Sequence, residues 1–230
     1  MTANAPLNLQ SWAPPELFKP EQADEGPVDA RGADWRAMQL KGINLSKARL
    51  CRTDLRGTDL SNCILDGADL RLARYDQHTQ WPEGFDQRSC GAVGPGAKLN
   101  AAFLNNTDLR GMDLRGANLM GAYLSGADLS GAVLENVRLT GADLRFAILR
   151  GAVCRGARFG GCQLDFCDFR AADLTGAGLE TAESIQGADF SGSIGLGDQR
   201  QALMSRPYKE LDCWNPLTRR HTREGLEAGG

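Results

Sequence analysis

The chain has 230 residues, of which 42% are hydrophobic and 24% are charged, and its formal net charge is -3. It lacks the roughly 18 to 20 consecutive apolar residues that a membrane-spanning helix needs, and its N-terminus lacks the pattern of a secretory signal. Seven Cys, an odd number in a chain of this length, do not fit a disulfide framework. These features predict a protein of one or two domains without a membrane span, located in a reducing cytoplasm.

Residues 1–27 are predicted to form an extended arm, because five prolines in this stretch forbid a continuous helix. Trp12, Leu17 and Phe18 lie in the arm, and their apolar side chains need burial. They either cover the open end of the structure that follows or dock a partner.

The main signal is an apolar residue at every fifth position. The series runs over residues 35–75 and 99–179 and, after a one-residue slip near Glu183, over 185–190. Its 28 repeats hold 21 of the 30 Leu. A small residue lies two positions before most of the apolar ones, and Gly commonly lies two positions after them.

Neither regular secondary structure explains a period of five. In a helix, five residues advance the direction by about 500°, so the Leu would not form a stripe. In a flat strand, successive Leu would point to opposite faces. The chain must therefore turn a corner every five residues, which predicts a solenoid with the Leu and the small residues inside.

The repeats resemble those of a known family. Segments such as 117–121, 127–131 and 142–144 are similar to the A(D/N)LXX consensus of the pentapeptide repeat family. The resemblance implies an all-β fold, a right-handed quadrilateral β-helix with four repeats per coil. It covers two arrays, 28–75 and 97–195, and is specific for fold, whereas members of the family differ in function.

Residues 76–96 interrupt the repeats and are predicted to form an inserted loop. The segment resembles an insertion found in cyanobacterial members of the family. Its aromatic residues, Trp81 and Phe85, either pack the loop against the coil or serve a function.

Residues 196–230 lose the period and are predicted to form a C-terminal cap and tail. Short helices are expected over 198–204 and 208–214. The side chains expected to face inward are Met204, Leu211 and Trp214, and the arginines expected in a mobile tail are Arg219, Arg220 and Arg223.

The sequence offers little for catalysis. It has two His, His78 and His221, and no motif for binding a metal, a phosphate or a cofactor. Most Cys fall on inward positions, where a thiol is compact filler, whereas Cys51 falls on an outward one. An enzyme would need a site around His78 and Asp86, so we expect no enzymatic activity, cofactor or metal.

The charge pattern bears on nucleic-acid partners. The two arrays hold 17 acidic and 18 basic residues, so their body is nearly neutral. A protein that binds nucleic acid directly needs a basic body, so we expect no direct nucleic-acid binding here. Some members of the family mimic DNA and bind topoisomerases such as gyrase. The nearly neutral body weakens this DNA-mimic alternative, although one side of the solenoid could still be acidic.

Outward apolar residues are the candidate partner-binding site, since exposed apolar patches commonly mark protein interfaces. With four repeats per coil, residues 20 apart should stack. The candidates are Phe103, Tyr123, Phe146, Phe166, Ile148, Val133 and Val153, together with Trp81 and Phe85 of the loop. Alternatively, the aromatic ladders only stiffen the sheet, or the tails cover them. We therefore predict a non-enzymatic scaffold or regulator that binds a protein partner, with a homodimer through the same residues as a second possibility. The resemblance of the loop implies a member of the cyanobacterial type.

Overall fold

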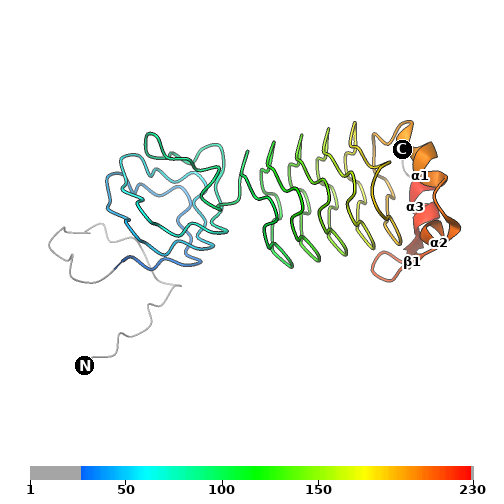
Figure 1. Cartoon of the computed structure of the whole chain (residues 1–230), viewed down its shortest axis with the longest axis horizontal. Helices are drawn as coiled ribbons and strands as arrows, with labels where there is room; N and C mark the ends of the chain where they lie inside the picture. The colour runs from blue at the N-terminus through cyan, green and yellow to red at the C-terminus, as the bar shows by residue number, and fades with distance from the viewer. Residues whose placement is uncertain (1–26, 229–230) are drawn as a thin grey trace, which may run out of the picture. The chain divides into compact units, whose positions relative to one another are not determined.

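The computed structural model describes residues 27–228 and divides into two units, Met1–Val93 and Gly94–Gly230 (Figure 1). Apart from Pro27, the predicted N-terminal arm lies outside the described residues, and so do Trp12, Leu17 and Phe18. Within residues 27–228, no helix has the length and apolar character needed to cross a membrane.

The second unit is a stack of 20-residue coils (Figure 1). Residues 20 apart pair as parallel bridges, and four such pairs occur in each coil, so a coil has four sides. We number the ladders of paired residues by side. Ladder 1 contains Phe103, Tyr123, Asp143, Gln163 and Ser184; ladder 2 contains Asp108, Asp128, Ile148, Asp168 and Asp189; ladder 3 contains Asp113, Val133, Val153, Asp173 and Ile194; ladder 4 contains Lys98, Asn118, Arg138, Arg158 and Gly178.

A tight turn after each central apolar residue explains the period of five. At Leu124, the backbone N–H of Ala127 donates to the Leu124 carbonyl at 2.9 Å. Gly126, between them, has a φ of 69°. A turn with positive φ at its third position favours glycine, because a side chain there is strained. The glycines that recur with the five-residue period are therefore corner residues.

The central residues fill the interior, as the sequence predicts. Leu124 and the small residue Ala127 are fully buried, as are the aromatic replacements Phe159, Phe169 and Phe190. The rings of Phe169 and Phe190 stack with centroids 5.2 Å apart. Close packing of Leu and Ala on successive coils gives an apolar core along the whole stack.

The first unit has the same coil, and part of segment 76–96 continues it. Gln80 pairs with Asp59, and Val93 pairs with Arg74. The hydroxyl of Thr79, which occupies a small inward position, donates to a backbone carbonyl one coil below at 2.9 Å. This segment therefore supplies two paired positions of the coil, with loops between them.

The chain after the coils folds into short elements at one end of the second unit (Figure 1). They are α1 (Gln199–Met204), α2 (Tyr208–Leu211), β1 (Trp214–Asn215), β2 (Arg220–His221) and α3 (Thr222–Glu227), and β1 and β2 form an antiparallel pair. Their polar side chains satisfy backbone groups of the last coil. Glu210 accepts from the N–H of Ile185 at 3.0 Å, and Asn215 donates to the carbonyl of Gly187 at 2.7 Å.

Two expectations for this region are wrong. Trp214 was expected to face inward but is 49% exposed, because β1 turns the neighbouring Asn215 toward the coil instead. The expected mobile arginine tail is structured: Arg220 lies in β2, and Arg223 lies in α3 and pairs with Asp212 at 3.2 Å. Of the expected inward residues, Leu211 is buried and Met204 is half-buried.

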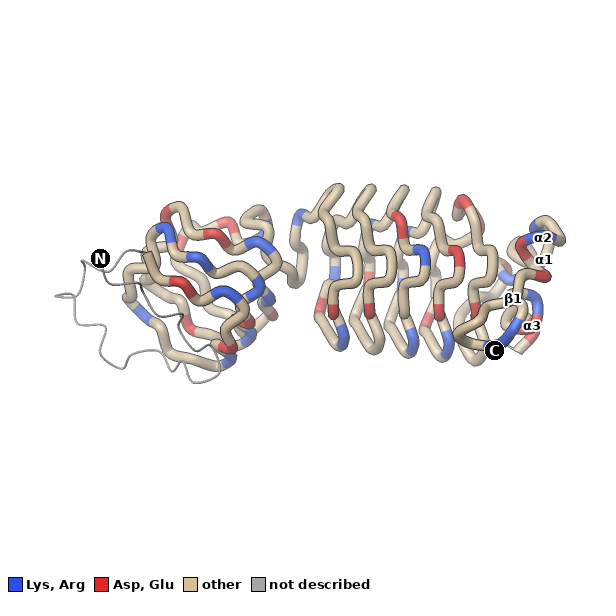
Figure 2. Tube along the Cα trace, turned by 90° about the horizontal axis from the view of Figure 1, so that it is seen from below, with Lys and Arg blue, Asp and Glu red and all other residues tan. Residues whose placement is uncertain are grey.

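The surface charges pair within single repeats. In an Asp-x-Arg repeat, such as Asp143 and Arg145, the guanidinium donates twice to the carboxylate, at 2.9 and 2.7 Å. The same fork occurs at Asp29–Arg31, Asp34–Arg36, Asp54–Arg56, Asp69–Arg71, Asp108–Arg110, Asp113–Arg115 and Asp168–Arg170. Acidic and basic residues therefore alternate along the coils (Figure 2).

Candidate functional site

The predicted aromatic residues of the second unit form two stacked pairs. Phe103 and Tyr123 lie on ladder 1 with ring centroids 4.8 Å apart. Phe146 and Phe166 lie at the corner after ladder 1, with centroids 5.0 Å apart and planes 6° from parallel. Phe103 is 73% exposed and Phe146 is 48% exposed. Stacking at a spacing of 20 residues is as the sequence predicts.

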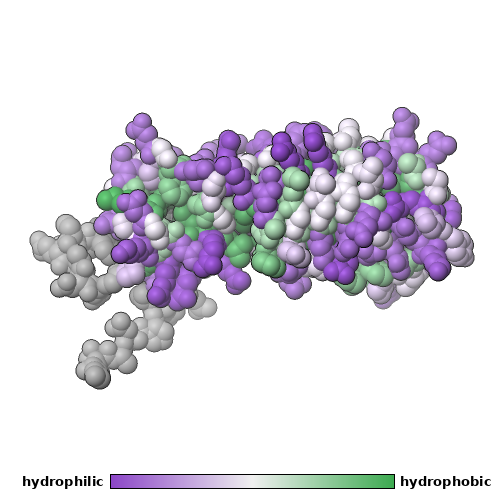
Figure 3. Space-filling model, viewed as in Figure 1, coloured by the Kyte–Doolittle hydropathy of each residue, from purple (hydrophilic) through white to green (hydrophobic). Residues whose placement is uncertain are grey.

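The other predicted residues do not join these pairs in one patch. Ile148 is half-buried on ladder 2. Val133 and Val153 are half-buried on ladder 3. In a four-sided coil, ladder 3 is opposite ladder 1. Apolar side chains accordingly appear on the visible face as limited areas among polar ones (Figure 3).

Trp81 and Phe85 belong to the first unit. Their rings stack with centroids 5.2 Å apart, and Trp81 meets the buried Tyr75 edge to face at 5.6 Å. Both loop side chains are half-buried. These contacts fit the packing role that was one of the two alternatives for the loop.

Phe146 and Phe166 are the only aromatic residues among the twelve described non-glycine residues with positive φ. Their φ angles are 61° and 59°, in the left-handed region that glycine occupies at most corners. A bulky side chain there costs on the order of 1–3 kcal/mol. Strain of this kind is concentrated at functional sites, which makes this pair a better candidate than the Phe103–Tyr123 pair.

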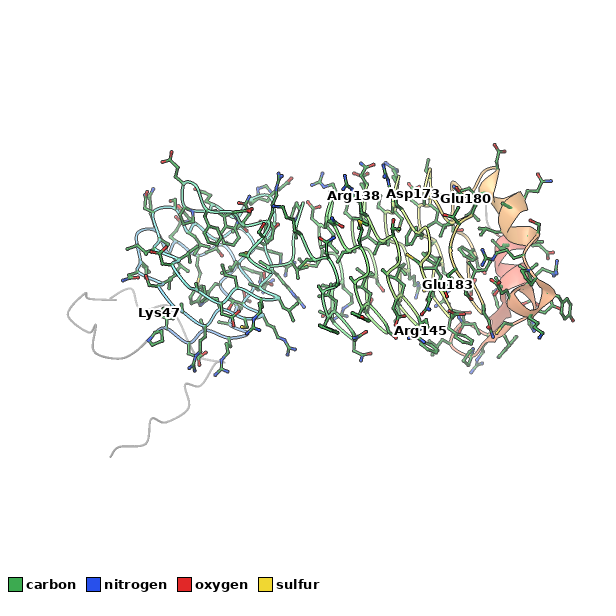
Figure 4. The ribbon with its side chains drawn as sticks, viewed as in Figure 1. Lys47, Arg138, Arg145, Asp173, Glu180 and Glu183 are labelled. Carbon is green, nitrogen blue, oxygen red and sulfur yellow. The ribbon has the colours of Figure 1, made fainter. Side chains whose placement is uncertain are left out.

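A shallow groove of about 340 Å³ lies beside the Phe146–Phe166 pair. We call it the Phe146 groove. It is lined by Arg145, Phe146, Gln163, Asp165, Phe166, Glu183 and Ser184. Arg145 and Glu183 are labelled in Figure 4, both in the second unit. The groove thus combines aromatic rings with ionisable side chains.

Glu183 reaches the groove because one extra residue is inserted in the coil. Gln163 pairs with Ser184, 21 residues later instead of 20. Bulges of this kind re-aim side chains, often next to functional sites. Arg206, between α1 and α2, holds the bulged segment by donating to the carbonyls of Ala182 at 3.0 Å and Glu183 at 2.8 Å.

The charges in the groove are unbalanced toward acid. Arg145 is already bound by Asp143, and these hydrogen bonds lower the pKa of the Asp143 carboxyl and raise that of the Arg145 guanidinium. Asp165 accepts a hydrogen bond from the Ser184 hydroxyl at 2.6 Å. Neither Asp165 nor Glu183 forms an ion pair among residues 27–228. Arg145 also interacts electrostatically with Asp165, but one guanidinium stands against the three carboxylates of Asp143, Asp165 and Glu183, so the groove has excess negative charge that attracts a cation.

The thiols are poor candidates for nucleophiles. Burial raises the pKa of Cys154 to about 12 and that of Cys162 to about 11. Cys51, the outward thiol, also has a raised pKa, first through burial and then through its hydrogen bond with Asp69. A raised pKa reduces the thiolate that a nucleophile needs.

The repeats match a known protein family. The family described as Pentapeptide repeats matches residues 39–74, 96–131, 117–153 and 152–182, which together are more than half of the chain. The chain belongs to the pentapeptide repeat family. The predicted right-handed, four-sided β-helix is therefore confirmed, with its four ladders visible in the bridge pattern.

Several solved structures resemble this pentapeptide repeat protein. HetL of the cyanobacterium Nostoc, involved in heterocyst differentiation regulation, is 32% identical, with 72% of this chain and 76% of HetL covered and a TM-score of 0.34. A pentapeptide repeat protein from the Arabidopsis thaliana thylakoid lumen is 31% identical, with 58% of this chain and 89% of that chain covered and a TM-score of 0.41. Full-length QnrB1, a plasmid-mediated fluoroquinolone resistance protein, is 15% identical, with 73% of each chain covered and a TM-score of 0.23. No curated protein sequence matches the chain.

Sequence reasoning missed the polar residues of the groove in this pentapeptide repeat protein. Gln163, Asp165 and Ser184 occupy ordinary outward positions of the repeat, so their sequence context gives no sign of a groove. Glu183 is the exception, because the one-residue slip in the five-residue period lies at this residue and marks an irregular position. The second irregularity visible in the sequence is phenylalanine at two corner positions, 146 and 166, where Gly is usual.

Proposed function

We propose that this protein is a non-enzymatic scaffold or regulator that docks a protein partner at the Phe146 groove. The observation that carries the proposal is the coincidence of three departures from the repeat. Two phenylalanines occupy left-handed corner positions, and an inserted residue brings Glu183 to the same groove. Each departure has a cost in a regular solenoid, so their common location favours a binding role.

The remaining surface supports a rigid scaffold. The coils are held by backbone hydrogen bonds of about 2.7 to 3.2 Å along their sides, so groups on the surface keep fixed positions. Aromatic side chains are frequent anchors of protein interfaces because they bury a large area with few rotatable bonds. The location of this groove on a rigid stack suits recognition of a preformed surface.

The DNA-mimic alternative is less favoured. A DNA mimic needs carboxylates arranged without neutralising neighbours, whereas most outward Asp in this protein form forks with the Arg two residues later. The two arrays also hold nearly equal numbers of acidic and basic residues. The resulting surface lacks a sustained negative potential.

The double variant Phe146→Asp with Phe166→Asp is expected to abolish partner binding while retaining the fold. Both side chains reach the surface, and Asp tolerates a left-handed backbone better than Phe does. The measurement is capture of partner proteins from the native host by wild-type and variant protein, quantified by mass spectrometry, with circular dichroism as the check on folding.

The matched control is Ile194→Asp, since Ile194 is 53% exposed on ladder 3 and lies outside the groove. This control is expected to keep the partner. Unchanged capture by the folded double variant would refute the proposed docking site. If the captured partner is a second copy of the chain, sedimentation of the wild-type protein will reveal a dimer that the double variant loses.

A further inference from the structure

We propose that the Phe146 groove binds an arginine side chain presented by the partner protein. This inference rests on the proposed function, because it names the chemistry of the partner at the same groove. It follows from the charge balance of the groove, the orientation of its rings and the hydrogen-bonding capacity of its carboxylates.

The charge of the groove selects a cation. Asp143 neutralises Arg145 through two hydrogen bonds, at 2.9 and 2.7 Å. Arg145 also interacts with Asp165, so one guanidinium faces three carboxylates, and those of Asp165 and Glu183 belong to successive coils. An anionic ligand would be repelled by both carboxylates, whereas a cationic side chain would complete their ion pairing.

The aromatic pair favours a cationic side chain with an apolar stem, because the stem can pack against the rings. Phe146 and Phe166 are stacked, so each ring covers a face of the other. Phe166 also packs tightly on Gly187, where a Cβ atom would come within 2.6 Å of the ring. Phe166, which lies between Phe146 and Gly187, therefore offers mainly its edge to a ligand. Ring edges carry partial positive charge and suit the methylene stem of a side chain better than its cationic head.

The hydrogen-bonding groups favour arginine over lysine. Oδ1 of Asp165 accepts from Ser184 at 2.6 Å, and Oε2 of Glu183 has only a long contact of 3.4 Å with Gln163. Carboxylate oxygens on both coils therefore retain acceptor capacity among the described residues. A guanidinium presents five donors in a planar fork and can engage two carboxylates together, whereas an ammonium acts as a compact point charge.

The experiment is a titration of the full chain, carrying ring-labelled phenylalanine, with the peptide acetyl-Gly-Arg-Gly-amide. Saturable shifts of the Phe146 and Phe166 ring signals are expected, with a dissociation constant of about 1 mM for a single side chain. The Phe103 ring is an internal control and should not move. The citrulline peptide, which has nearly the same shape but no charge, is expected to bind at least ~10-fold more weakly, and the lysine peptide is expected to bind more weakly than the arginine peptide.

A charge variant tests the same inference independently. Glu183→Gln is expected to weaken binding of the arginine peptide by up to about 5-fold, the change that loss of one exposed ion pair produces. Glu180→Gln is the matched control, because Glu180 is an exposed carboxylate that does not line the groove (Figure 4). This control should leave binding unchanged.

The outcomes separate this inference from the proposed function. Equal binding of the arginine and citrulline peptides, or no shift of the Phe146 and Phe166 rings, would overturn the arginine site. If the double phenylalanine variant still loses its partner in that case, docking at the groove stands and only the chemistry assigned to the partner is wrong. If partner capture is also unchanged, both proposals fail.

Discussion

Leu144→Ala is expected to lower the free energy of unfolding by about 3 kcal/mol. Leu144 is fully buried, and coils above and below it restrict collapse around a smaller side chain. The loss combines the transfer of the Leu side chain with the cavity that it leaves. Urea unfolding followed by circular dichroism measures the change.

Met120→Ala is the control for this prediction, because Met120 is 41% exposed. Its effect is expected to remain within about 0.5 kcal/mol. If Leu144→Ala cost no more than Met120→Ala, the interior of the coil would not be the close-packed Leu ladder described above.

Gly225→Ala is expected to destabilise the protein by about 2 kcal/mol. Gly225 lies in α3, where a Cβ atom would be 2.9 Å from Oδ1 of Asp189 and 2.9 Å from the backbone nitrogen of Phe190. Helix α3 must then move away from the last coil. Unfolding measurements and faster hydrogen exchange of residues 222–228 would register this displacement.

Whether Gly225→Ala raises or lowers the stability shows whether α3 packs tightly on the last coil. In an exposed helix, replacing Gly by Ala stabilises by roughly 1 kcal/mol, so destabilisation can come only from the close contact with the coil. Glu227→Ala, at an exposed position of the same helix, is expected to have little effect. Stabilisation by Gly225→Ala would contradict the tight packing of α3 on the last coil.

The repeat arrays could be predicted because the five-residue turn fixes both the spacing and the burial of the chain. A central Leu, a small inward residue and a corner glycine are each required by the geometry of one turn, so the period reveals the coil. The C-terminal region has no such constraint. There, individual polar side chains, such as those of Glu210 and Asn215, bond to the coil, and Trp214, beside Asn215, is left exposed.

The candidate site was predictable only in part. Stacking of Phe146 on Phe166 follows directly from the 20-residue coil. The candidate apolar residues do not all meet in one site, since an offset of five residues moves a side chain to the next side of the coil. Val133 and Val153 therefore face away from Phe103 and Tyr123. The polar lining of the groove depends on which outward residues meet at a corner, and the period does not encode this.

Site-specific photo-crosslinking tests docking at the Phe146 groove most directly. The photoreactive residue p-benzoylphenylalanine would replace Phe146 in one sample and Ile194 in another, and both proteins would be irradiated in the native host. The account predicts a defined crosslinked partner from position 146 and not from position 194, with an arginine near the crosslinked site in the partner. The same products from both positions, or a partner from position 194 alone, would contradict it.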